Sequence, residues 1–168
     1  LGRDFDEAFL KALIAVGFRF PLKKILVSSG PMESKIGFVR TARLLENFGV
    51  TYYATAGTAR FMHRMGFKPE MVYWPLDNKE PNALSLIKSG ELDLVVNIPK
   101  DHEEEELTND YIIRRAAVDF DVPLVTNLQI AQRLAEALTA RNYQDLPADG
   151  WREYHRRFDP VTKGMEVS

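Results

Sequence analysis

The sequence of 168 residues contains no cysteine. This absence excludes disulfide bonds, thiolate metal sites and a cysteine nucleophile, and it suits a reducing compartment such as the cytoplasm. Histidine is scarce as well, and the chain holds only His63, His102 and His155. No two of these stand at the spacing of metal ligands, so we expect no metal site.

The sequence also lacks an excess of either charge and any long apolar run. Its formal net charge is −2 at pH 7, which offers no electrostatic basis for binding nucleic acid or an anionic membrane. No apolar stretch approaches the roughly 18 residues that would span a bilayer. Neither G-x-x-x-x-G-K-[ST] nor G-x-G-x-x-G occurs, so nucleotide binding of those two kinds is unsupported. We expect neither nucleic acid nor a membrane among the partners.

The residues that are present indicate a globular protein with 45% hydrophobic and 27% charged side chains, ordinary values for one domain of this length. Short apolar runs typical of buried strands alternate with stretches at helical spacing. The expected strands are 24–28, 50–53, 71–74, 92–97 and 122–126. The expected helices are 4–16, 35–48, 58–65, 82–88, 109–120, 127–141 and 151–158.

This alternation predicts an α/β fold with a doubly wound, five-stranded parallel sheet and helices on both faces, which makes three layers, α/β/α. We divide the chain into a helix and linker at 1–22, the α/β domain at 23–142 and a C-terminal tail with a short helix at 143–168. The acidic run at 103–106 is expected to form a solvated loop.

In such sheets ligands bind beyond the carboxyl ends of the strands. Polar or aromatic residues follow every expected strand, namely Ser28 and Ser29, Thr55 to Thr58, Trp74, Asn97, and Thr126 with Asn127. No acid–base pair or metal cluster is evident among them. We therefore expect a pocket of hydroxyls, an amide, lysines and an indole, which binds a small anion with some apolar bulk rather than breaking bonds.

The stretch at 54–59 lies where the second strand ends and a helix begins. We expect Gly57 to allow a tight turn and a close approach of the ligand, with Thr55 and Thr58 adding hydroxyls beside the unpaired N–H groups of the first helical turn. Such a helix start would form a small anion cradle. The alternative is that Thr58 is simply an N-cap and Gly57 simply a turn residue.

The motif A-T-x-G-T-A at 54–59 is followed in fixed order by 95–99, 111–117 and 122–127. With the opening segment 3–12, these pieces resemble the C-terminal allosteric domain of the carbamoyl-phosphate synthetase large chain, which has the methylglyoxal-synthase-like fold. The resemblance runs over nearly the whole length. It implies that 1–22 is a helix and linker from the preceding synthetase region.

The resemblance implies a regulatory, non-catalytic domain without a cofactor of its own. In the family this domain binds effectors that change the activity of ATP-dependent ligase domains elsewhere in the chain, so ATP, Mg and bicarbonate are implied for the parent enzyme of arginine or pyrimidine biosynthesis. The implied partners are a small anionic effector, the remaining synthetase domains and a glutaminase small subunit, and a homo-oligomer is left open. A urea-cycle type of enzyme would place the chain in the mitochondrial matrix instead of the cytoplasm.

The family's ligand-binding threonines and asparagine match Thr55, Thr58 and Asn97. Many bacterial members, regulated by nucleotide and ornithine, have a lysine where this chain has Trp74. The tryptophan resembles the branch activated by acetylglutamate. The expected effector is therefore N-acetylglutamate-like or a nucleotide monophosphate.

The chain departs from the acetylglutamate branch at two positions, since Lys100 and Asp110 stand where that branch has further asparagines. Lys100 could attract a carboxylate, whereas Asp110 would repel one unless it is paired. Ser28 and Lys35 of the first loop and helix complete the expected effector site.

Enzymes of the same fold supply the alternative function, a stand-alone enzyme acting on a phosphate ligand. Methylglyoxal synthase uses aspartates and a histidine, but its first-loop aspartate falls in 28–31 and its histidine near Glu106, and its other acid maps to Glu80 or Asp77 only with a gap. The inosinate cyclohydrolase domain shares the run G-T-A-R at 57–60. A pure interaction module is the third class and would need an exposed apolar patch.

Overall fold

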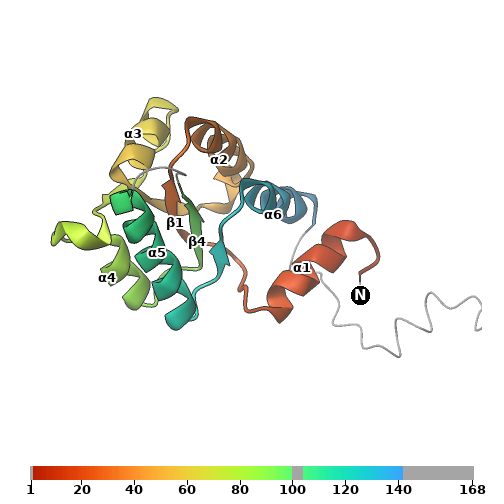
Figure 1. The fold of residues 1–168 in the computed structure, drawn as a ribbon. Helices are drawn as coiled ribbons and strands as arrows, with labels where there is room; N and C mark the ends of the chain where they lie inside the picture. Colours follow the sequence, from red (N-terminus) through yellow and green to blue (C-terminus); the bar gives the residue numbers. More distant parts are fainter. Residues whose placement is uncertain (1, 100–103, 142–168) are drawn as a thin grey trace, which may run out of the picture.

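The computed structural model describes residues 2–99 and 104–141 (Figure 1). The predicted effector residue Lys100 and the predicted helix at 151–158 lie outside the described residues. Among the residues described, no helix combines the length and the apolar character needed to cross a membrane.

Five parallel strands form one sheet in the order β3-β2-β1-β4-β5. This arrangement confirms the predicted doubly wound parallel sheet, with β1 at its centre. The strands are β1 Lys24–Ser29, β2 Thr51–Thr55, β3 Glu70–Val72, β4 Leu94–Ile98 and β5 Leu124–Val125.

Helices cover both faces of the sheet, as the alternating pattern predicts. Helices α2, α3 and α6 lie on one face with α1 packed outside α6, and α4 and α5 lie on the other (Figure 1). The helices are α1 Phe5–Ala15, α2 Met32–Leu44, α3 Ala56–Arg64, α4 Ala83–Lys88, α5 Glu104–Asp119 and α6 Leu128–Ala140, with short 3-10 turns η1 Glu46–Phe48 and η2 Pro75–Asp77.

The core has two halves because successive residues of a strand point to opposite faces of the sheet. In β1, Ile25 and Val27 join the cluster under α2, α3 and α6, whereas Leu26 joins the cluster under α4 and α5. All three are at most 1% exposed. The carboxyl ends of the strands are thereby held in fixed register beside the first turns of the helices.

Three helix starts differ from the prediction. Helix α2 begins at Met32, directly after Pro31, instead of at residue 35, and α3 begins at Ala56 instead of Thr58. Helix α5 begins at Glu104, so the glutamates at 104–106 belong to a helix and the predicted loop is wrong for them.

The buried face of α1 does not include all of its apolar residues. Phe5 is 65% and Val16 73% exposed, while Glu7 and Leu10 are buried. The reason is that α1 packs against α6 rather than against the sheet, and the Arg133 guanidinium lies 4.6 Å from the centre of the Phe5 ring. The proposed division of the chain at residue 22 remains a prediction.

Candidate functional site

A cavity of about 320 Å³ opens at the carboxyl edge of the sheet. It lies where β1 and β2 end and α3 begins, and Trp74, just before η2, and Asp110 of α5 contribute to its wall. Six of the predicted effector residues line it together, namely Lys35, Thr55, Gly57, Thr58, Trp74 and Asp110. The remaining lining residues are Ser29, Gly30, Ala56 and Arg60.

The first turn of α3 faces this cavity without a side-chain cap. Thr55 occupies the N-cap position, but its hydroxyl makes no capping bond and instead donates to Ser28 Oγ at 3.3 Å. A helix start leaves its first N–H groups without intrahelical acceptors, and these groups attract anions. The cavity therefore has a donor-rich wall formed by backbone.

Thr58 joins α3 to the end of β1. Its hydroxyl accepts a bond from the Ser29 N–H at 3.0 Å and donates to the Ser29 carbonyl at 3.2 Å. The hypothesis that Thr58 is an N-cap is wrong, because Thr58 is the third residue of α3 and bonds to a neighbouring strand.

Gly57 has an ordinary helical backbone, since it is absent from the residues with positive φ. The predicted tight turn is therefore wrong. A Cβ built on Gly57 would lie 3.8 Å from Lys35 Nζ, so what the glycine provides is open space beside an ammonium group. Lys35 in turn donates to the Gly30 carbonyl at 3.0 Å.

Two further lining residues could contact an anion: Ser29, one of the strand-end residues expected at this edge, and Arg60, which escaped the sequence-based selection. The Ser29 side chain is 4% exposed, and its hydroxyl has no hydrogen-bond partner among the described residues. An unpaired buried hydroxyl costs about 1–3 kcal/mol, so a ligand oxygen bound there would remove that penalty. Arg60, exposed on α3, adds a second cation to the wall.

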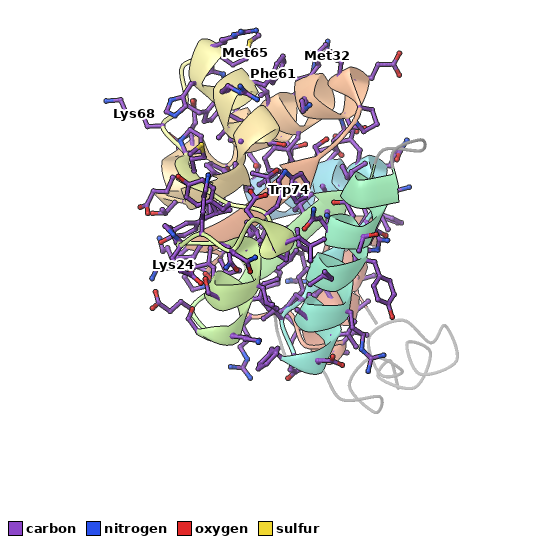
Figure 2. All side chains as sticks on the ribbon, turned by 60° about the vertical axis from the view of Figure 1, so that its left-hand side comes forward. Lys24, Met32, Phe61, Met65, Lys68 and Trp74 are labelled. Atoms are coloured by element: carbon purple, nitrogen blue, oxygen red, sulfur yellow. The ribbon has the colours of Figure 1, made fainter. Side chains whose placement is uncertain are left out.

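The opposite wall combines an aromatic ring with a carboxylate. Trp74 is partly buried and packs on the hydrophobic cluster under α4 and α5; in Figure 2 it lies near the middle of the view, between α3 and α5. Asp110 of α5 is 2% exposed and accepts bonds from Asn97 Nδ2 at 2.7 Å and Ser28 Oγ at 3.4 Å.

Asn97 and Ser28 lie behind the cavity wall and do not line it, contrary to the prediction that they contact the effector directly. Asn97 is 0% exposed, and its Oδ1 accepts from Arg114 Nη1 at 3.0 Å. Because a guanidinium only donates, this bond fixes the amide so that Nδ2 donates to Asp110. Ser28 and Asn97 are register partners on β1 and β4, so both point toward α5.

The cavity offers little for acid–base catalysis. Among the described residues, Asp110 is the only acidic residue that lines the cavity, and no histidine lines it. Glu80 caps the region before α4 by accepting from Ser85 Oγ at 2.6 Å, and Asp77 accepts from the Trp74 N–H at 3.2 Å. Both acids that a lyase could use are thus engaged in structural bonds, and neither lines the cavity.

A second cavity, of about 200 Å³, lies at the amino edge of the sheet and includes Arg19, Asp93 and Asp121. Asp93 accepts from the backbone N–H groups of Lys23 and Lys24 at 2.7 and 2.8 Å, which is a structural role. None of the predicted effector residues lines this cavity, so we place the site at the carboxyl edge.

Comparison with known proteins gives a consistent picture. Residues 37–126 match the family described as the MGS-like domain. The carbamoyl phosphate synthase large chain of Methanoregula boonei is 33% identical over 153 residues, covering 91% of this chain and 14% of its own length. The human mitochondrial carbamoyl-phosphate synthase [ammonia] is 36% identical over 142 residues, covering 82% and 9%.

A third relative, the C-terminal section of the carbamoyl phosphate synthase large chain of Methanopyrus kandleri, is 36% identical over 138 residues and covers 82% of this chain and 25% of its own length. The chain therefore spans no more than a quarter of each of these three relatives.

Proposed function

The chain belongs to the MGS-like domain family, and from this premise we propose that it is the regulatory, effector-binding part of a carbamoyl phosphate synthase. Its relatives are segments of larger synthase chains and multifunctional proteins. In this proposal the domain binds a small anionic metabolite and modulates ATP-dependent carbamoyl phosphate synthesis elsewhere in the full chain. ATP, Mg and bicarbonate, and a glutaminase subunit, belong to that longer enzyme.

The observation that carries the proposal is the open donor wall of the cavity. The uncapped start of α3, Ser29 with its unpartnered hydroxyl, and the cations Lys35 and Arg60 all line the same cavity. An anion bound there would accept from backbone N–H groups and from charged donors at once, and charge-assisted bonds are the stronger kind.

In this proposal Thr55 and Thr58 hold the groups that bind the anion in place. The Thr58 hydroxyl is already used as a donor to Ser29, and the Thr55 hydroxyl donates to Ser28. They hold β1, β2 and α3 so that the Ser29 hydroxyl and the α3 N–H groups meet the anion. Trp74 would pack on the apolar part of the effector. The resemblance of this tryptophan to the branch activated by acetylglutamate implies an N-acetylglutamate-like ligand, with a nucleotide monophosphate as the other expected class.

Calorimetry on this chain with N-acetylglutamate, uridylate, inosinate, ornithine and inorganic phosphate tests the proposal. We expect at least one of the anions to bind, and Arg60→Ala to raise its Kd about tenfold. Arg64→Ala is the matched control, because Arg64 is exposed on the same helix but does not line the cavity. Alanine at Thr58 is unsuitable, since it would leave the buried Ser29 N–H without its acceptor.

Binding by none of these compounds, or equal effects of the two arginine substitutions, would overturn the proposal. Turnover of dihydroxyacetone phosphate would favour the alternative, an enzyme of the methylglyoxal synthase type.

A further inference from the structure

Trp74, the aromatic residue of the cavity wall, lies next to the short turn η2. We infer that Asn109 of α5 is the positioning residue that holds this turn and hence Trp74. Trp74 immediately precedes η2. Within the turn, the Trp74 N–H donates to Asp77 Oδ2 at 3.2 Å and the Asp77 N–H to the Trp74 carbonyl at 3.1 Å. These bonds shape the turn but do not attach it to the rest of the fold.

Besides the packing of Trp74 on the cluster under α4 and α5, a hydrogen bond to α5 attaches the turn. The Leu76 N–H, in the middle of η2, donates to Asn109 Oδ1 at 3.1 Å. Asn109 is only 4% exposed, whereas the Leu76 side chain is 47% exposed and so provides little anchoring by packing. A buried acceptor that meets a turn's central N–H fixes the position of that turn.

The same helical turn of α5 therefore sets two parts of one wall. Asp110 reaches the cavity itself, and its neighbour Asn109 sets the place of Trp74 through Leu76. The separation between the indole and the donor wall of α3 depends on this hydrogen bond. The consequence for ligand affinity rests on the proposed function, but the effect on Trp74 does not.

The test uses the fluorescence of Trp74 without any ligand. The chain has two tryptophans, so all variants carry Trp151→Phe. Asn109→Leu removes the acceptor at similar size, and Leu76→Pro removes the donor from an exposed position. We expect both to raise the acrylamide quenching constant of Trp74 about twofold, because the turn loses its tie to α5.

Two further variants separate positioning from general destabilisation. Asn109→Asp keeps an acceptor oxygen and should restore the parent quenching. Asn127→Leu is the matched control, since Asn127 also accepts backbone N–H bonds, from Gln129 at 2.8 Å and Ile130 at 3.3 Å, but at the start of α6. It should lower the melting temperature while leaving Trp74 quenching unchanged.

Unchanged quenching in both Asn109→Leu and Leu76→Pro would overturn the inference, and so would an equal change in Asn127→Leu. If Asn109→Leu fails to fold, as circular dichroism would reveal, Leu76→Pro decides alone. Titration with N-acetylglutamate adds a second arm, in which Asn109→Leu should weaken binding about fivefold, the loss of roughly one neutral hydrogen bond's contribution. Failure of the parent to bind any anion would refute the proposed function and leave the quenching result standing.

Discussion

Ser28 and Ser29 are adjacent and chemically identical, yet their surroundings are opposite. The Ser28 hydroxyl faces α5, where it donates to Asp110 and accepts from Thr55. The Ser29 hydroxyl points to the other side of the strand and has no partner among the described residues. The two-residue period of a strand produces this difference. In the proposed function Ser28 would therefore support the site and Ser29 would contact the ligand.

Gly57 gives a prediction at the same scale. Gly57→Ala should leave the free energy of unfolding unchanged or raise it by up to about 1 kcal/mol, because alanine favours a helix and the site needs no positive φ. The added methyl group would occupy the space beside Lys35 Nζ. Urea denaturation measures the first effect and phosphate calorimetry the second.

We expect the Kd for phosphate to rise about tenfold in Gly57→Ala. Gly90→Ala serves as a contrast, since Gly90 has φ 71° far from the cavity and alanine there should destabilise without changing affinity. A stable Gly57→Ala variant with parental affinity would show that the cradle does not need open space at this position.

At the scale of elements, the sequence predicts which helices and strands form, and in what order, better than it predicts the residues at which they begin and end. The mainly apolar run at 92–97 corresponds to β4, because a strand buried on both faces is largely apolar, with Asn97 as the polar exception. The start of α5 escaped prediction because consecutive glutamates carry no apolar period. The inward face of α1 escaped it because its partner is another helix, which the sequence does not identify.

The site shows the same limit. The strand-end rule brings Thr55 and Trp74 to one cavity, where Asp110, chosen from the family resemblance, also lies. The rule cannot say which polar groups already bond to neighbouring side chains. Asn97 lies behind the wall, where Arg114 and Asp110 bond to the two ends of its amide. Those partners come from α5, and the sequence alone does not indicate which side chains of a helix face a given strand.

Helix α1 yields a prediction about pH. Burial raises the pKa of Glu7, but hydrogen bonds from Lys11 and Arg3 outweigh burial and lower that pKa to about 2. A carboxylate with a lowered pKa in the folded state stabilises the fold above the unfolded pKa near 4.5 and loses this contribution as the pH falls toward 2.

Glu7→Gln should therefore lower the free energy of unfolding by about 1 kcal/mol at pH 7 and converge with the parent below pH 3. Urea denaturation across this range measures both curves. Glu136→Gln is the control, because Glu136 pairs with Arg133 at an exposed position and should leave the acid dependence of the parent intact. Parallel curves for parent and Glu7→Gln would contradict the assignment.

At the scale of the whole molecule, ligand binding and folding are linked. A ligand that binds only the folded chain stabilises it by an amount set by its concentration relative to Kd, about 2.7 kcal/mol at 100 times Kd. We expect inorganic phosphate to raise the melting temperature in this graded manner. Chloride at equal ionic strength is the control, and an equal rise with chloride would point to a general salt effect.

Strand β1 runs from the segment that follows α1 to the cavity. Its first residue, Lys24, follows the segment that leads from α1, and its last residue, Ser29, borders the cavity; Figure 2 shows Lys24 well below Trp74. Six residues of strand span about 20 Å, flanked by β2 and β4. A displacement at the cavity is thus transmitted along one stiff strand as far as Lys24, where the segment that leads back to α1 begins.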